Sequence, residues 1–347
     1  MIGLDFLFGG SDGVGLGRLS KLHGFGSNPG QIKARCYVPA RLAPQPALVV
    51  ALHGCNQGAG AMDLGTGWSA LADRYGFLLL YPEQRRANNP GVCFNWFVPD
   101  AVRRGSGEVE SIRQMIDTMV RRHGADSSRV FLVGLSAGGA MASAMLAAYP
   151  ELFAAAAIIA GVPSGCADSV GDAVDCMGGR VRAPTTSLVD HVRRASPHAG
   201  PWPRISVWHG TDDTTVALTN GDDIVRQWIG VHGLPARPTR SLSVDGYPYR
   251  VWEDRSGTPV VEQYVITGLA HGAPLAPGAL TGQSGAAGPY MLDAAISSTD
   301  RIAAFFGLRD AIPEPAEATP LRRPRVSPLS DVHDLFESAL RAVGVVR

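Results

Sequence analysis

The stretch RVFLVGLSAGGAMASAMLAAYP, residues 129–150, decides the fold. Residues 130–133 are an unbroken apolar run, which predicts a strand buried on both faces of a parallel sheet. A G-x-S-x-G turn centred on Ser136 follows, and an Ala- and Met-rich segment of helical length then runs to Pro150. Strand, turn and helix in this order are typical of a nucleophile elbow, which holds the serine hydroxyl out at the sheet edge. The buried strand and the long helix argue against a merely flexible Gly-Ser turn.

Composition limits the class of protein. The 347 residues are 45% apolar and 18% charged, and the formal net charge is zero, as in an ordinary globular protein. The sequence has no basic stripe of the kind that binds nucleic acid. It also has no apolar run that is long enough for a membrane span. No cysteine belongs to a C-x-x-C motif. A zinc site or a thioredoxin-like motif is therefore disfavoured. We expect no metal and no cofactor.

The segments around this stretch alternate between strand and helix patterns. Strands are expected at residues 32–38 (an antiparallel edge), 47–52, 77–81, 130–133, 154–160, 205–208, 249–253 and 260–266. Helices are expected at residues 68–75, 108–123, 220–231 and 293–306, besides the helix that ends at Pro150. Residues 161–184 show no periodicity and are interpreted as a long loop. This pattern predicts an α/β fold with a mainly parallel sheet and helices on both faces.

The chain divides into three expected segments. Residues 1–30 are a Gly-rich N-terminal segment, residues 31–308 are the catalytic domain, and residues 309–347 are a Pro-rich linker plus an amphipathic helix at 331–343. That helix is expected to pack on the body or to join a second copy of the chain as a homodimer. The first ten residues lack the basic and apolar regions of a signal peptide. The protein is therefore cytoplasmic, or its export signal is missing from this sequence.

Five cysteines leave at least one unpaired. Cys36 lies in an apolar strand and is expected in the core. Cys166 and Cys176 lie close together in the 161–184 segment, where a disulfide between them would close the loop. Free buried thiols are an equally weighted alternative.

A serine nucleophile needs a base, and the base needs a carboxylate that orients it. Three buried strands follow Ser136, and the second and third end at Asp212-Asp213 and at His271. The order Ser, Asp, His is that of the α/β hydrolases. Of nine histidines, His271 alone follows the last sheet strand, and of the two aspartates we choose Asp213.

Two backbone N–H groups are expected to stabilise the oxyanion. One belongs to Ala137, directly after the nucleophile, and the other to Cys55, in the loop after the 47–52 strand. His53 and Gly54 would shape that loop. The Cys55 thiol is expected to be incidental, because no base is placed to activate it.

Several motifs in the same order resemble those of the polyhydroxybutyrate (PHB) depolymerase family of esterases. They are LHGCNQ (52–57), YGFLLLYPEQ (75–84), CFNWF (93–97), RGSGEVESI (104–112), GLSAGGAM (134–141), HGTDDTTV (209–216) and GLAHG (268–272). The resemblance covers residues 30 to 307. It implies an α/β-hydrolase fold, hydrolysis of carboxylic esters, an extracellular location, a triad of Ser136, Asp213 and His271, and an oxyanion contact at Cys55.

The resemblance leaves the substrate open. We favour a serine esterase that forms an acyl-enzyme on short-chain or 3-hydroxyalkanoate esters and oligomers, with a feruloyl or acetylxylan esterase as the alternative. A serine peptidase or a non-catalytic relative is less favoured. The family often has Trp-Pro after the catalytic histidine, whereas this chain has Gly272-Ala273-Pro274, so an aromatic pocket wall is expected to be missing.

Three residues are expected to contact substrate. Asn56 and Gln57 follow the oxyanion residue directly, and Trp96 lies in a long loop between Phe94 and Phe97. Core packing and the rim of the acyl pocket are equally weighted interpretations of Trp96. The chain after Leu308 is too short for a separate polymer-binding module, so soluble esters are expected to be preferred over crystalline polymer.

Overall fold

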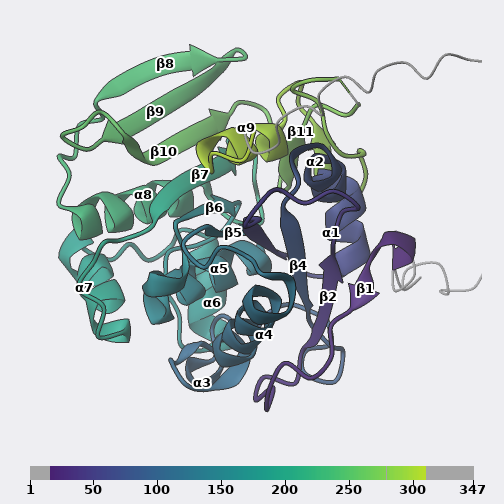
Figure 1. Cartoon of the computed structure of the whole chain (residues 1–347). Helices are drawn as coiled ribbons and strands as arrows, with labels where there is room; N and C mark the ends of the chain where they lie inside the picture. Colours follow the sequence, from purple (N-terminus) through teal and green to yellow (C-terminus); the bar gives the residue numbers. More distant parts are fainter. Residues whose placement is uncertain (1–15, 279, 310–347) are drawn as a thin grey trace, which may run out of the picture. The chain divides into compact units, whose positions relative to one another are not determined.

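A ten-stranded sheet forms the centre of the computed structural model, which describes residues 16–278 and 280–309. The strand order is β1-β2-β4-β3-β5-β6-β7-β10-β9-β8, and the six strands from β4 to β10 in that order are parallel to one another (Figure 1). The strands are β1 (Ser20–Lys21), β2 (Lys33–Tyr37), β3 (Leu48–Leu52), β4 (Leu78–Glu83), β5 (Val130–Leu135), β6 (Ala155–Ile159), β7 (Arg204–Gly210), β8 (Arg240–Val244), β9 (Tyr247–Glu253) and β10 (Pro259–Ile266).

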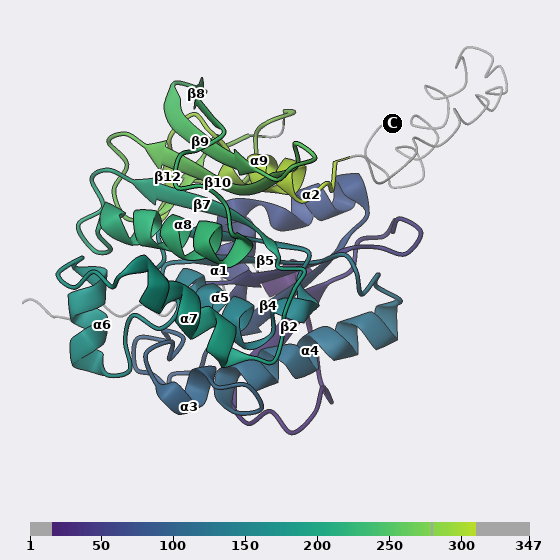
Figure 2. The same cartoon turned by 90° about the vertical axis from the view of Figure 1, so that its left-hand side faces the viewer.

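Helices cover both faces of this sheet, as the strand composition predicts (Figures 1 and 2). Successive residues of a strand point to opposite faces. On β5, Leu132 packs with α4, α5 and α8, whereas Phe131 and Val133 pack with α1, α2 and α9. The helices are α1 (Ala59–Thr66), α2 (Trp68–Tyr75), α3 (Pro99–Val102), α4 (Gly107–His123), α5 (Ala137–Ala148), α6 (Val170–Met177), α7 (Thr185–Ala195), α8 (Leu218–His232) and α9 (Ser298–Phe305).

Parallel register brings the functional loops to one edge of the sheet. Leu52 of β3 lies opposite Gly134 of β5, and Gly210 of β7 lies opposite Ile266 of β10. The loops that leave β3, β5, β7 and β10 therefore emerge side by side, which is where ligands bind in open α/β sheets. The sequence prediction of a mainly parallel sheet with helices on both faces is confirmed.

The prediction of a structureless loop at residues 161–184 is wrong, because α6 lies within it. Ser169 caps α6 by accepting a hydrogen bond from the Asp172 amide, but Val170 and Val174 are exposed. Val170, Ala173, Val174 and Met177 share one face, but the helix has only eight residues, which is too short for hydrophobic periodicity to identify it. The next helix, α7, is also absent from the expected helices, and it carries His191. Leu188 and Val192 are its buried i, i+4 pair.

Other differences lie at the sheet margins. The strand at 33–37 is not the edge, since the two-residue strand β1 pairs with its outer side. The strand β8 extends the predicted hairpin, and α1 precedes the predicted α2. The last helix begins at Ser298 rather than at 293, because β12 (Met291–Asp293) pairs there with β11 (Ala273–Leu275).

Two sequence predictions concern parts of the chain that the structure does not describe. The linker and helix expected within residues 310–347 lie outside the described residues, as do residues 1–15. The homodimer through residues 331–343 therefore stays a prediction. Within the described ranges, none of the helices is long and apolar enough to cross a bilayer.

Candidate active site

The turn between β5 and α5 holds Ser136 in a backbone conformation that residues with side chains rarely adopt. Its φ is 57° and its ψ is −119°. The Ser136 amide donates to the Ile159 carbonyl oxygen at 2.9 Å, which anchors the turn to β6. A Cβ atom at Gly134 would overlap the Gly138 carbonyl oxygen, and one at Gly138 would overlap the Leu52 carbonyl oxygen. Both positions therefore need glycine, and the turn has the shape that the sequence predicts.

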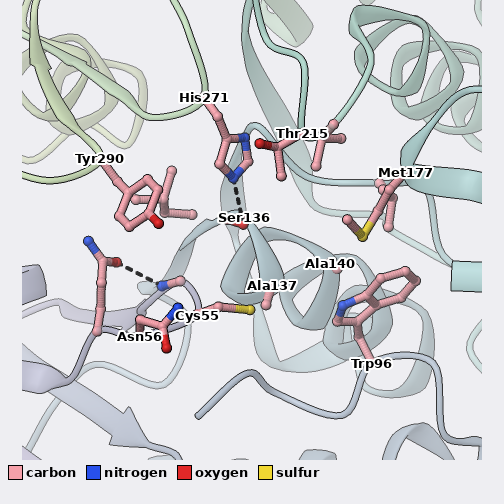
Figure 3. A pocket seen from close by; sticks show the side chains of 15 residues that line it. Cys55, Asn56, Trp96, Ser136, Ala137, Ala140, Met177, Thr215, His271 and Tyr290 are labelled. Atoms are coloured by element: carbon pink, nitrogen blue, oxygen red, sulfur yellow. Dashed lines mark hydrogen bonds between the residues drawn. The ribbon is translucent and has the colours of Figure 1, made fainter. Parts of the chain in front are cut away.

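Three side chains from three loops form a chain of hydrogen bonds. The Nε2 atom of His271, after β10, lies 2.8 Å from Ser136 Oγ. Its Nδ1 atom lies 2.7 Å from the Oδ2 atom of Asp213, after β7. Because a carboxylate only accepts, Nδ1 carries the proton and Nε2 is left to accept a hydrogen bond from the serine hydroxyl (Figure 3).

Asp213 and Asp212 have different surroundings, although they are adjacent in sequence. Asp213 is buried, and its Oδ1 atom accepts from the amides of Thr215 at 2.9 Å and Val216 at 2.8 Å. Burial acts to raise the pKa of Asp213, but the hydrogen bonds from His271 and the Val216 amide outweigh it and hold this pKa below its usual value. Asp212 is exposed and accepts only from the Thr211 hydroxyl among the described residues.

His209 is a second histidine beside Asp213 that sequence reasoning missed. Its Nε2 atom lies 2.8 Å from the Val216 carbonyl oxygen and 3.5 Å from Asp213 Oδ2. Burial lowers the pKa of His209, so the ring is neutral. The ring packs under the carboxylate loop and fixes its shape. Its position at the end of β7, four residues before Asp213, was the available signal.

The loop after β3 brings Cys55 and Gly54 next to the nucleophile. A Cβ atom on Gly54 would lie 3.3 Å from Ser136 Cβ. The Nε2 atom of His53 accepts a hydrogen bond from the Gln84 amide at 3.1 Å. The proton of the ring is therefore on Nδ1, which donates to the Gly54 carbonyl oxygen at 2.8 Å. Burial lowers the pKa of His53, which keeps the ring neutral in that arrangement. A buried histidine thus holds the loop from behind.

Gln57 also holds this loop. Its Oε1 atom accepts from the Gly54 amide at 2.9 Å, and only 7% of the residue is exposed. Gln57 and Asn56 both line the pocket at Ser136, where the sequence analysis expected substrate contacts. Gln57 is buried and Asn56 is exposed, so Asn56 is the more accessible of the two.

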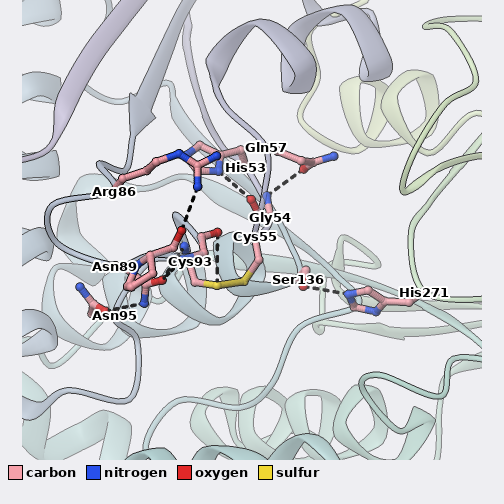
Figure 4. Close-up of a disulfide and its surroundings, with 12 residues drawn as sticks. His53, Gly54, Cys55, Gln57, Arg86, Asn89, Cys93, Asn95, Ser136 and His271 are labelled. Carbon is pink, nitrogen blue, oxygen red and sulfur yellow. Dashed lines mark hydrogen bonds between the residues drawn. A yellow bond between two sulfur atoms is a disulfide. The ribbon is translucent and has the colours of Figure 1, made fainter. Parts of the chain in front are cut away.

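A disulfide joins Cys55 to Cys93, so the expectation of an incidental Cys55 thiol is wrong (Figure 4). The bond ties the loop after β3 to the loop that carries Trp96. The disulfide between Cys166 and Cys176 is the pair that the sequence analysis considered. Cys36 is free and buried, as expected.

Trp96 and Tyr290 form aromatic walls around the pocket over Ser136, which has a volume of about 260 Å³ (Figure 3). Trp96 is 9% exposed and packs edge-on against Phe97, so it belongs to both the core and the pocket rim. Tyr290 lies edge-on to the ring of His271, at 6.1 Å between centroids, with a positive φ of 62°. The expectation of a missing aromatic wall is wrong.

The wall comes from a different part of the chain than the family pattern suggests. Gly272 and Ala273 are buried and do not line the pocket. A Cβ atom on Gly272 would lie 2.8 Å from the Tyr290 carbonyl oxygen, so the backbone of Tyr290 packs directly on this glycine. Tyr290 is 19 residues beyond His271 in an irregular segment, and no local pattern marked it.

Glu108 supports the segment that leads to Trp96. Its carboxylate accepts from the backbone amide of Asn95 at 2.9 Å, from the Asn95 side chain at 2.7 Å and from Gln84 Nε2 at 2.6 Å. Burial raises the pKa of Glu108, and these hydrogen bonds offset part of that effect. The GEVES motif therefore positions the pocket wall from the first turn of α4.

The sheet, the turn at Ser136 and the Ser–His–Asp hydrogen bonds define a serine hydrolase of the α/β-hydrolase class. Residues 34–240 match the family described as esterase PHB depolymerase, and the chain belongs to that family. Poly(3-hydroxyalkanoate) depolymerase C of Paucimonas lemoignei is 44% identical over 291 residues, which are 84% of this chain and 70% of that protein.

Acetylxylan esterases are further relatives. A probable acetylxylan esterase A of Aspergillus fumigatus is 33% identical over 267 residues, which are 75% of this chain and 71% of that protein. The solved structure of an acetyl xylan esterase from Aspergillus awamori has a TM-score of 0.71 and 28% identity, and the match covers 84% of this chain and 100% of that one. The protein is therefore a carboxylic ester hydrolase, as the sequence analysis predicted.

Proposed function

We propose that Ser136, His271 and Asp213 hydrolyse esters through an acyl-enzyme. His271 Nε2 takes the hydroxyl proton as Ser136 Oγ attacks the carbonyl carbon, and the imidazolium then gives that proton to the leaving alcohol. Water, activated by the same nitrogen, releases the acid and restores the serine. The 2.8 Å contact between Oγ and Nε2 is the observation that carries this proposal.

The backbone amides of Cys55 and Ala137 stabilise the oxyanion in this proposal. Ala137 is the first residue of α5, so its amide has no partner within the helix, and Cys55 borders the same pocket. Hydrogen bonds to the developing negative charge contribute most where water is excluded, and the apolar side chains of Trp96 and Val162 line this pocket.

The substrates we propose are short-chain esters and soluble oligomers of 3-hydroxyalkanoates. The 44% identity to a poly(3-hydroxyalkanoate) depolymerase and the uncharged, partly aromatic lining of the pocket both support this class. A feruloyl or acetylxylan esterase is the second candidate, favoured by the 0.71 TM-score with an acetyl xylan esterase.

An extracellular location is part of the proposal. Two disulfides, Cys55–Cys93 and Cys166–Cys176, are typical of proteins that fold in an oxidising compartment.

The experiment compares the wild-type chain with Ser136→Ala on nitrophenyl butyrate, followed by 3-hydroxybutyrate trimer, methyl ferulate and acetylated xylan. We expect Ser136→Ala to lose several orders of magnitude in kcat with an unchanged circular dichroism spectrum. Retained turnover in this variant would remove Ser136 from the mechanism. Faster cleavage of methyl ferulate or acetylated xylan than of the trimer would select the second candidate.

A further inference from the structure

A second cavity of about 360 Å³ adjoins the pocket over Ser136. It lies between α5, the segment 163–168 and α7, and we call it the α5 cavity. Trp96 and Ala140 line both the pocket and this cavity, so the two spaces meet at these residues. A volume of this size is in the range of small-molecule sites, which is about 300–1,000 Å³.

Alanines form the floor of the α5 cavity. Ala140, Ala144 and Ala147 lie on one face of α5, beginning one turn after Ser136, and all three line the cavity. This face extends about 10 Å along the helix axis at 1.5 Å per residue. The opposite wall is fixed by the Cys166–Cys176 disulfide. The cavity is therefore a built space that leads away from the nucleophile.

Arginine side chains line this cavity. Three arginines and His191 line it, together with Asp168 as the one carboxylate among the described lining residues. The pocket over Ser136 has no Lys, Arg, Asp or Glu in its described lining. The same is true of a third cavity of about 320 Å³ on the far side of Tyr290.

One of the three arginines, Arg104, already has hydrogen-bond partners within the protein. Arg104 donates to the Ala148 carbonyl oxygen at 2.6 Å and to Glu151 at 2.5 Å, and it lies over the Tyr149 ring. These partners hold its charge in place. The arginines that can reach a ligand are therefore the other two.

Arg103 and Arg194 pair only weakly within the protein. Arg103 lies 2.9 Å from Asp100, and Arg194 lies 4.0 Å from Asp190. The arginine side chains are 67% and 74% exposed, respectively. Exposed pairs of this kind contribute little to stability, so a carboxylate of the ligand can replace the internal partner at small cost.

We propose that the α5 cavity binds the leaving side of a hydroxyacid oligoester and that Arg103 and Arg194 bind its terminal carboxylate. The proposal rests on the proposed function. When the ester carbon bonds to Ser136 Oγ, the C–O bond breaks and the leaving oxygen takes a proton from His271. In an oligomer of hydroxyacids the leaving piece then has a hydroxyl at one end and the free carboxylate at the other. The charge therefore always lies on this side of the scissile bond.

The first test compares 3-hydroxybutyrate trimer as the free acid with the same trimer ending in a primary amide. The wild-type chain should have a higher kcat/KM for the acid, and the preference should shrink in 0.5 M salt. The double variant Arg103→Gln/Arg194→Gln should lose about fivefold to tenfold on the acid and nothing on the amide. Arg193→Gln removes one charge at an exposed position that is next to Arg194 and does not line the cavity; it is the control and should change neither.

The second test fills the cavity. Ala144→Leu should lower kcat/KM for both trimers by a much larger factor than for methyl butyrate, whose leaving group, methanol, is too small to fill the cavity. Equal rates for acid and amide with the wild-type chain would overturn the carboxylate contact. Unchanged trimer rates in Ala144→Leu would overturn the cavity as the binding site. If the wild-type chain does not hydrolyse nitrophenyl acetate, the proposed function itself is overturned.

Discussion

Cys55 and Cys93 are joined by a disulfide, which connects the loop after β3 to the loop before α3 at the edge of the active-site pocket. Cys55 borders the pocket beside Ser136, and Trp96 follows Cys93 by three residues. One covalent bond therefore positions both the proposed oxyanion donor and an aromatic wall. Its contribution to catalysis lies in backbone position rather than in thiol chemistry.

Removal of this disulfide should lower activity as well as stability. We expect Cys55→Ser/Cys93→Ser to lose about tenfold to hundredfold in kcat on nitrophenyl butyrate, because a displaced oxyanion amide loses part of its effect. The cross-link spans 38 residues, and its loss should cost up to about 4 kcal/mol in free energy of unfolding. Kinetics and urea unfolding measure the two effects.

The second disulfide supplies the control for that experiment. Cys166→Ser/Cys176→Ser opens a cross-link that spans only 10 residues and lies away from the proposed oxyanion site. It should leave nitrophenyl butyrate hydrolysis near the wild-type rate. Wild-type kcat in the Cys55→Ser/Cys93→Ser variant would show that the loop keeps its position without the bond.

Asp213 and Asp212 form a matched pair for testing the triad. Asp213→Asn should lower kcat by about ten-thousandfold, because an amide in place of the carboxylate stabilises the wrong tautomer of His271. Asp212→Asn, at an exposed carboxylate, should stay within a factor of two or three. Steady-state kinetics on nitrophenyl butyrate decide between them. The opposite ranking would assign the orienting role to Asp212.

The sequence was sufficient to predict Ser136, Asp213 and His271 as neighbours for a geometric reason. Each follows the carboxyl end of a strand in a parallel sheet, and the register from β5 to β10 brings those ends together. Strand identity could be predicted from apolar runs.

Features that depend on long-range packing could not be predicted in the same way. The Cys55–Cys93 pairing joins residues 38 positions apart, and five cysteines allow many pairings. Tyr290 reaches the pocket because its backbone packs on Gly272, a contact between residues 18 positions apart. Helix α6 has only eight residues and exposes Val170 and Val174, so it is too short for its apolar periodicity to identify it from the sequence.

Trp96 should contribute to both the pocket and the core. Trp96→Ala should lower kcat/KM for nitrophenyl butyrate by about tenfold, because the wall between the pocket and the α5 cavity is lost. It should also cost about 3–5 kcal/mol in free energy of unfolding, as for other buried aromatic residues. The chain should remain folded at 25 °C.

Phe97 separates these two contributions. It packs edge-on against Trp96 but does not line the pocket. Phe97→Ala should therefore lower stability while kcat/KM changes by less than about threefold. Equal losses of kcat/KM in both variants would mean that loosening of the loop, rather than removal of the wall, reduces the activity.

Glu262 should make stability fall as the pH rises. This carboxyl lies on β10, is 4% exposed and accepts hydrogen bonds from the Ser206 hydroxyl at 2.7 Å and the Tyr249 hydroxyl at 2.8 Å. Burial raises its pKa from 4.5 to about 7, against the effect of both hydrogen bonds. Between these two pKa values the folded protein binds more protons than the unfolded chain. The stabilisation from the neutral acid is therefore complete below pH 4.5 and is lost as the pH rises through 7.

Glu262→Gln removes the ionisation while keeping the shape of the side chain. Relative to the wild-type chain, the variant should gain about 3 kcal/mol in free energy of unfolding between pH 4 and pH 8, because the wild-type carboxyl has a pKa of about 7 in the folded protein and 4.5 in the unfolded chain. Urea unfolding at intervals of one pH unit measures this difference. Glu253→Gln, on the adjacent strand β9, changes the net charge equally and is the control. If the stability difference between wild type and Glu262→Gln does not change with pH, then folding does not raise the pKa of the Glu262 carboxyl.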